Sequence, residues 1–189
     1  MAMQTLIRQV TYREFRAMEF SESEGEEFIF ELINGEIMAR NYPSAMHQRV
    51  LRRLTVQVDA FVNQNQLGEV FFAPFGVVLS DFNDVQPDLI FVGKKQADIV
   101  REEGIFGVPD LLMEVISPSS IRTDRRVKFK MYEEMGVKEY WIVDLKNQSI
   151  EVYTLDETGF EMTSFGVEKG AVMSIVLPEF MIDLEMLFA

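Results

Sequence analysis

The chain of 189 residues is long enough for one domain with a sizeable hydrophobic core and too short for two domains of ordinary size. No apolar run approaches bilayer length, the first residues lack the layout of a signal peptide and there are 0 cysteines, so we expect a cytoplasmic protein without a membrane span. The net charge of −13 opposes non-specific attraction to nucleic acid, which depends largely on lysine and arginine.

Two short elements are expected before residue 41. Thr11 and Glu14 have the spacing of a capping box, which predicts a short helix over residues 12–18. Asn34-Gly35 separates the apolar runs 28–33 and 36–40 and predicts a hairpin, because a type I′ turn needs positive φ at both central residues. Glu31 lies within this hairpin among apolar neighbours.

A long helix is expected over residues 45–66, with Ser44 as its N-cap. Apolar side chains recur at helical spacing along one face, and His47, the single histidine, lies at the N-terminal end of that face. The following strand-like run 70–79 is interrupted by Pro74 and Gly76, which indicates an edge strand or a bulge. Residues 80–84 are expected to form a polar turn.

Two apolar, strand-like runs each carry one carboxylate: Asp88 lies within 85–92 and Glu114 within 110–116. The run 111–116 is apolar at every position except Glu114, which predicts a strand covered on both faces. Acidic side chains are almost never fully buried unless they are paired or bind a metal, so Glu114 needs a partner. A helical segment is expected in the connection 94–107.

A further helix is predicted to begin near residue 123 or 124 and to end at Gly136. Asp124, Lys128 and Tyr132 form a stripe at i, i+4 spacing, adjacent to the apolar stripe of this helix. Lys128 therefore lies beside the buried face. Five basic residues are concentrated here and leave room for a basic rim beside an acidic site: Arg122, Arg125, Arg126, Lys128 and Lys130.

Residues 140–144 and 150–154 are predicted to form a second hairpin, followed by short strands near 160–164 and 172–176 and a terminal turn at 181–187. The elements together predict one α/β (α+β) domain over 1–189, with a central mixed sheet that carries Asp88 and Glu114, flanking helices and added hairpins. The helical stripes argue against the alternative, an all-β sandwich. The 16 phenylalanines and the strands that need edge protection predict a homo-oligomer, most simply a dimer.

Gln86-Pro87-Asp88, the run from Met113 to Ser119 and the run from Lys128 to Asp144 together resemble the Uma2 (DUF820) family, and the resemblance extends over most of the chain. That family is placed among the PD-(D/E)XK nuclease-like folds, so the resemblance implies a restriction-endonuclease-like core. It also implies an endonuclease that acts on nucleic acid and depends on Mg²⁺ or Mn²⁺, with Asp88 and Glu114 as metal ligands. Two carboxylates completed by water and phosphate oxygens suit such a cation.

The family pattern has a lysine two residues after Glu114, and this sequence departs from it with Ile116. Lys128 on the following helix is the plausible substitute, because its ammonium could reach the attacking water or the phosphate. The resemblance also makes Glu31, His47 and Gln86 members of the catalytic site.

Each candidate also has a purely structural interpretation: Asp88 as a strand-start carboxylate, Glu114 as the ion-pair partner of Lys128, and His47 as a core histidine. Buried ion pairs rarely add net stability over apolar replacements, so the coincidence of these residues favours a site. The rival function is a catalytically inactive nuclease-like fold that serves as a binding or assembly module. The sequence lacks the motifs of serine-nucleophile hydrolases, of zinc sites and of nucleotide-binding loops.

Overall fold

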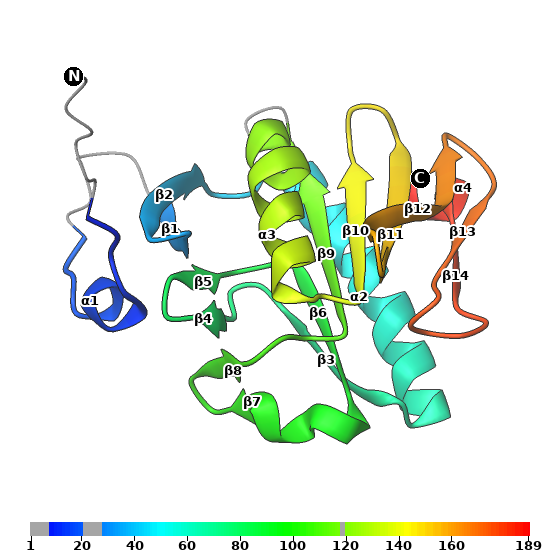
Figure 1. Cartoon of the computed structure of the whole chain (residues 1–189). Coiled ribbons are helices and arrows are strands. Elements are labelled where there is room, and N and C mark those ends of the chain that lie inside the picture. The colour runs from blue at the N-terminus through cyan, green and yellow to red at the C-terminus, as the bar shows by residue number, and fades with distance from the viewer. Residues whose placement is uncertain (1–7, 21–27, 118–119) are drawn as a thin grey trace.

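Two six-stranded sheets organise the fold of the computed structural model, which describes residues 8–20, 28–117 and 120–189 (Figure 1). In chain order the elements are α1 (Tyr12–Arg16), β1 (Phe28–Ile33), β2 (Glu36–Asn41), α2 (Ala45–Asn65), β3 (Gly68–Phe72), β4 (Val77–Ser80), β5 (Asn83–Val85), β6 (Leu89–Gly93), η1 (Lys94–Ile99), β7 (Val100–Arg101), β8 (Gly104–Phe106), β9 (Leu111–Ile116), η2 (Thr123–Lys128), α3 (Phe129–Met135), β10 (Glu139–Asp144), β11 (Ser149–Asp156), β12 (Gly159–Val167), β13 (Ala171–Met173), β14 (Met181–Asp183) and α4 (Leu184–Phe188).

The central sheet is mixed, as predicted, and has the order β12-β11-β10-β9-β6-β3. Strand β9 runs parallel to β10 and antiparallel to β6. All six residues of β9 are buried, which confirms that this strand is covered on both faces. The interrupted run 70–79 divides as expected, with β3 at the edge of this sheet and β4 in the other.

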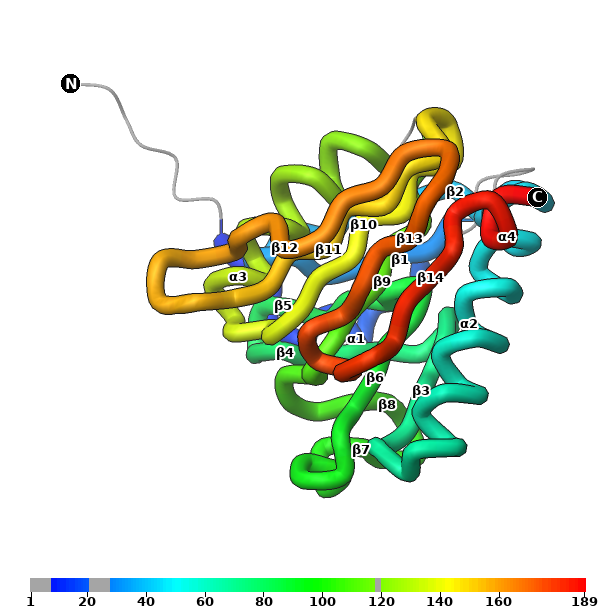
Figure 2. Tube along the Cα trace, turned by 90° about the vertical axis from the view of Figure 1, so that its right-hand side faces the viewer, coloured from blue at the N-terminus to red at the C-terminus, as the bar shows by residue number. Residues whose placement is uncertain are grey.

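Helices cover the two faces of the central sheet. The apolar stripe of α2 packs with Met113 and Val115 of β9 and with the C-terminal segment in one core cluster. Helix α3 contributes Met131 and Tyr132 to a second cluster, which contains the alternate β9 residue Ile116. Figures 1 and 2 show α2 and α3 on opposite sides of β9. Among the described residues, no helix combines the length and the apolar character needed to cross a bilayer.

The second sheet has the order β2-β1-β5-β4-β8-β7. It joins the predicted N-terminal hairpin to β4, from the strand-like run 70–79, and to three strands that lie mostly in the expected turn and connection, β5, β7 and β8. The expected polar turn at 80–84 is wrong in its second half, because Asn83 and Asp84 belong to β5. Tertiary contacts make this possible: the Asn83 amide oxygen accepts from the Asn34 N–H at 2.7 Å, and its amide donates to the Ser80 hydroxyl at 3.0 Å. The connection 94–107 holds the helical segment η1 but also the strands β7 and β8.

The predicted helix that ends at Gly136 is present, but its first part is a π-helix over η2. A π turn accommodates an extra residue, is rare and occurs frequently at functional sites. No residue pattern in the sequence predicted it. Gly136 ends the helix with φ +86°, as the sequence indicated. The predicted terminal turn is instead the strand β14 and the short helix α4.

Asp84 is a buried carboxyl group without the partners that such a group normally has. It is 7% exposed, and its carboxylate forms no hydrogen bond or ion pair with any described residue. Glu139 on β10 shows the usual situation: it is fully buried and accepts hydrogen bonds from Trp141, Ser174 and the backbone N–H of Ile175. Burial raises the pKa of Asp84 to about 6, although the nearby charge of Arg16 opposes the shift.

Replacing Asp84 by Asn is expected to stabilise the protein at neutral pH. The folded state holds the Asp84 proton more tightly than the unfolded chain, so the stability from this group is complete below about pH 4 and is lost as the pH rises through about 6. At pH 7.5 the variant should therefore be more stable by about 1–3 kcal/mol, with no difference below pH 4. Urea unfolding at both pH values measures this, with the exposed Asp81→Asn as control. A loss of stability at pH 7.5 would contradict it.

Candidate functional site

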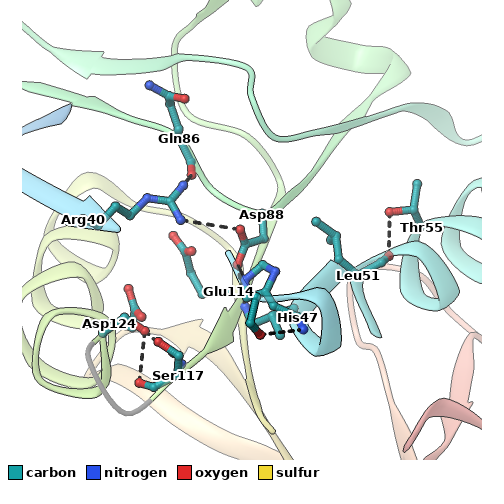
Figure 3. A network of polar contacts seen from close by, with 12 residues as sticks. Arg40, His47, Leu51, Thr55, Gln86, Asp88, Glu114, Ser117 and Asp124 are labelled. Atoms are coloured by element: carbon teal, nitrogen blue, oxygen red, sulfur yellow. Dashed lines mark hydrogen bonds and ion pairs between the residues drawn. The ribbon is translucent and has the colours of Figure 1, made fainter. Parts of the chain in front are cut away.

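A cavity of about 320 Å³ lies between β2, the start of α2 and the end of β9 (Figure 3). Its lining includes four of the residues singled out in the sequence, Glu31, His47, Asp88 and Glu114. They come from four elements, so only the fold brings them together.

The sheet register places the two carboxylates side by side. Asp88 immediately precedes β6 and Glu114 lies within β9. These strands are antiparallel, with Leu89 paired with Met113, so Asp88 and Glu114 occupy the next facing positions. Pro87 keeps the chain extended just before β6, which suits a strand start at which no ladder N–H is needed.

The Asp88 carboxylate is anchored through one of its oxygens. Oδ2 lies 3.0 Å from Nε2 of His47 and accepts from the Val115 N–H at 2.8 Å. Oδ1 lies 3.8 Å from a guanidinium nitrogen of Arg40. Burial would raise the pKa of Asp88, but the His47 hydrogen bond, the charges of His47 and Arg40 and the Val115 N–H hold it below its usual range. Asp88 is therefore ionised at neutral pH.

Glu114 is likewise anchored through one oxygen. Oε1 accepts from Nζ of Lys128 at 2.8 Å and from the hydroxyl of Tyr132 at 3.0 Å. Burial raises the pKa of Glu114 to about 8; Lys128 opposes this shift, and the neighbouring carboxylates Asp124, Asp88 and Glu31 add to it. Glu114 therefore gives up its proton less readily than an ordinary glutamate, and the ammonium of Lys128 or a further cation favours its ionised form.

Lys128 lies beneath the cavity with 1% of its side chain exposed. Its Nζ donates to Oε1 of Glu31 at 2.9 Å and to Glu114, and it lies 3.8 Å from Oδ1 of Asp124. Burial alone would lower the pKa of Lys128, but these carboxylates raise it well above the ordinary value. The residue is the last of η2, so the π turn directs it at Glu114. Lys128 is therefore a charged ammonium, and the surrounding carboxylates balance its positive charge.

The cluster carries more acid than base, which bears on metal binding. Four buried carboxylates, Glu31, Asp88, Glu114 and Asp124, face two permanent cations, Arg40 and Lys128, leaving two negative charges when all ionise. Oδ1 of Asp88 and Oε2 of Glu114 accept no hydrogen bond from a described residue, while both residues line the cavity.

This donor set fits a hard divalent cation such as Mg²⁺, which proteins often hold by two carboxylates with water and substrate oxygens. A fuller cage is absent: residues 8–20, 28–117 and 120–189 contain no group of three or more acidic or histidine side chains arranged around one metal position. A metal here would therefore depend on water or substrate for the rest of its coordination.

Two sequence expectations have a different structural outcome. Gln86 reaches the site only through its backbone: its N–H donates to Oε1 of Glu31 at 2.7 Å and its carbonyl accepts from Arg40 at 2.9 Å. Its side chain lines another cavity and points away from the carboxylates (Figure 3). Ile116, where the family pattern has lysine, is a buried core residue on the Glu114 face of β9.

Arg40 is a site residue that sequence reasoning missed. It lies on β2 with 22% of its side chain exposed, lines the cavity and is within 3.8 Å of both Glu31 and Asp88. An arginine beside apolar residues in a hairpin is ordinary, so the local sequence does not identify Arg40 as a site residue. Asp124 and Tyr132 had a signal, the i, i+4 stripe with Lys128, although no role in the site was expected for them.

The expected basic rim is smaller than the sequence suggested. Lys128 is buried, and Arg125 binds Glu151 at 2.7 Å and Asp144 at 3.3 Å. Burial and these acidic partners remove two of the five positive charges from the surface. Arg122, Arg126 and Lys130 are exposed.

Comparison with known proteins identifies the family and the fold of the chain. The model of the Uma2 family, described as "Putative restriction endonuclease", matches residues 12–185. Among solved structures, the crystal structure of a "putative nuclease belonging to DUF820" from Anabaena variabilis ATCC 29413 superposes with a TM-score of 0.72 at 18% identity, over 95% of this chain and 97% of that chain. This similarity shows a shared fold. No curated protein matches the chain.

Proposed function

Because the chain belongs to the Uma2 family, we propose that it is a metal-dependent endonuclease that hydrolyses phosphodiester bonds of nucleic acid. Family membership and the fold of the solved nuclease-like relative support a nuclease-like function. The observation that carries the finer proposal is the pair Asp88 and Glu114, which are neighbours across two strands and line one cavity, each with one oxygen that accepts no hydrogen bond from the described residues.

Asp88 and Glu114 would hold the metal ion, Mg²⁺ or Mn²⁺, which when bound lowers the pKa of a water molecule and stabilises charge on the phosphate. His47 keeps Asp88 oriented through Oδ2, so that Oδ1 faces the cavity. Glu31 holds the ammonium of Lys128 and is itself held by the Gln86 N–H. Each of these contacts fixes a side chain before substrate arrives.

Lys128 takes the part of the lysine absent at position 116. It approaches the Glu114 carboxylate from the helix that covers β9, and its pKa keeps it charged. An ammonium there orients a water molecule or stabilises developing negative charge. Arg40, which is partly exposed on the cavity, supplies a guanidinium for a phosphate oxygen.

The same proposal treats residues 1–189 as one cytoplasmic domain that forms a homodimer. Val56 on α2 and Phe72 on the edge strand β3 are exposed by 59% and 56% and line one apolar surface pocket, which supports association through this edge. Light scattering that gives the mass of a single chain would contradict the dimer.

A second function, a non-enzymatic binding or assembly module, is favoured by the Lys128–Glu114 ion pair and by the net charge of −13. In that case the two charges neutralise each other and no metal is needed. The small basic rim also limits attraction to a phosphate backbone.

Calorimetric titration of Mn²⁺ into the wild type and into Glu114→Gln separates the two functions, together with cleavage assays on single- and double-stranded DNA at low salt. We expect binding and metal-dependent cleavage by the wild type and neither by the variant. Glu134→Gln, which removes the same charge from an exposed side chain of α3, is the matched control and should behave as the wild type. Absence of heat and of cleavage with the wild type would favour the non-enzymatic module.

A further inference from the structure

A second cavity, of about 380 Å³, lies between α1, β1 and the β4–β5 hairpin. It shares no lining residue with the candidate catalytic cavity. The backbone N–H of Tyr12 donates to the carbonyl of Asp81 at 2.6 Å, which fixes the start of α1 against the β4–β5 turn. The proposed nuclease chemistry makes no use of this cavity.

Aromatic rings form much of its wall. Phe20 stacks on Phe30 with ring centroids 4.1 Å apart, and Phe15 lies at 5.5 Å from Phe20. Phe75 also lines the cavity and stacks on Phe71, which lies outside the lining, at 5.1 Å. Rings from α1, β1 and the segment before β4 thus present flat apolar surfaces to the cavity, an environment that suits a planar ligand.

Five polar residues line the same cavity, of which two are acidic and one is basic: Tyr12, Arg16, Asp84, Gln86 and Glu103. Asp84 is almost fully buried and has no hydrogen bond or ion pair with a described residue. Arg16 is near enough to affect the titration of Asp84, yet the two form no ion pair within the described part of the chain. A buried carboxylate that faces but does not touch a guanidinium leaves a space in which a ligand with both donors and acceptors fits.

We propose that this cavity is a binding site for a nucleobase, and that its polar groups select guanine. The ring would lie against the phenylalanines. Its N1–H and amino group would donate to the Asp84 carboxylate, while O6 and N7 would accept from Arg16 and from the Gln86 amide. Adenine and cytosine offer a carboxylate only their amino group, so guanine makes the additional hydrogen bond.

An organic ammonium ion is the main competing ligand, since aromatic rings and carboxylates also attract cations. Arg16 opposes it with a positive charge in the same cavity, whereas Glu103 adds a second carboxylate there, so the test includes a cationic ligand. A neutral base with a mixed edge satisfies the carboxylate and the guanidinium together.

The cavity is connected to the candidate catalytic site through two segments. Phe30 precedes Glu31 on β1, and Gln86 lines the nucleobase cavity with its side chain while its N–H holds Glu31. A base bound here would therefore contact the segments that position Glu31 and Lys128.

Ligand-detected NMR with guanosine, adenosine and cytidine, in EDTA so that no metal participates, tests the proposal. We expect guanosine to bind with a Kd on the order of 0.1–1 mM, and the other two nucleosides at least about tenfold more weakly. Asp84→Asn should weaken guanosine binding at least about tenfold, since one hydrogen-bond acceptor becomes a donor. Asp81→Asn removes the same charge from the neighbouring exposed turn and should leave guanosine binding unchanged, as should Glu114→Gln.

Equal binding of the three nucleosides, unchanged binding by Asp84→Asn, or binding of tetramethylammonium in place of guanosine would each overturn the guanine site. A DNA pentanucleotide with one central guanine among thymines, compared with free guanosine, identifies the source of the base. Tighter binding of the pentanucleotide assigns the cavity to a base of a nucleic-acid strand, and equal binding to a free nucleoside. Because guanosine has no phosphodiester, its binding is independent of whether the protein cleaves nucleic acid.

Discussion

Replacing Lys128 by Met is expected to lower the free energy of unfolding by about 3–5 kcal/mol, the largest stability loss of any single change in the site. Its ammonium is buried against three carboxylates, Glu31, Glu114 and Asp124. Methionine fills a similar volume but leaves these charges without compensation, and an uncompensated buried charge is strongly destabilising. Urea unfolding followed by circular dichroism measures the change.

Lys130→Met is the control for this prediction. Lys130 lies two residues further along the same helix, is 73% exposed and pairs with Glu134 at 3.5 Å. An exposed pair of this kind contributes about 0.3–0.5 kcal/mol, so the control should remain close to the wild type. Equal unfolding free energies for Lys128→Met and the wild type would show that the carboxylates of the cluster are protonated and need no cation.

Replacing Asp88 by Asn is expected to reduce metal-dependent cleavage by at least about 100-fold while leaving the protein folded. The amide keeps an oxygen that accepts from the Val115 N–H, as Oδ2 does in the wild type. It loses the negative charge that a hard cation requires. Single-turnover cleavage at saturating Mn²⁺ measures the rate, and calorimetry measures the loss of metal affinity.

His47→Phe provides a graded comparison with Asp88→Asn. His47 contacts Asp88 but is not an expected ligand, and loss of a residue that orients a ligand typically costs about 10–100-fold in metal affinity or activity. Asp88→Asn should therefore be the more severe variant. A wild-type cleavage rate in Asp88→Asn would remove this carboxylate from the reaction and end the two-carboxylate mechanism.

Local patterns in the sequence were sufficient for several elements. Asn34 and Gly35 both have positive φ in the hairpin turn, a conformation that these two residue types adopt readily. Ser44 caps α2 through the His47 N–H, and Thr11 and Glu14 form the predicted capping box. In each case the interacting residues lie within four positions of one another, so a short stretch of sequence is enough to predict the interaction.

The site was predictable in part for a different reason. Glu114 in an otherwise apolar strand and Lys128 beside an apolar helical stripe are local anomalies, and a buried charge needs an opposite charge. The pairing at 2.8 Å satisfies that need. Arg40 could not be found in this way, because its contacts with Glu31 and Asp88 exist only once β2 lines the cavity.

The sequence by itself therefore determined the main helices, the two hairpins and the strand that carries Glu114, because propensity, capping and apolar periodicity act over a few residues. The expected strand over 85–92 is wrong in its first half, since Val85 ends β5 of the other sheet and Asp88 lies just before β6. Tertiary structure alone decided that the N-terminal hairpin and β5 join into a second sheet, that Thr123–Lys128 forms a π turn and that the Gln86 side chain faces away from Asp88. It also left Asp84 buried without a hydrogen bond or ion pair to any residue that the structure describes. These features follow from contacts between segments that are far apart in the chain. Such contacts contribute to the free energy of folding only once the core has formed.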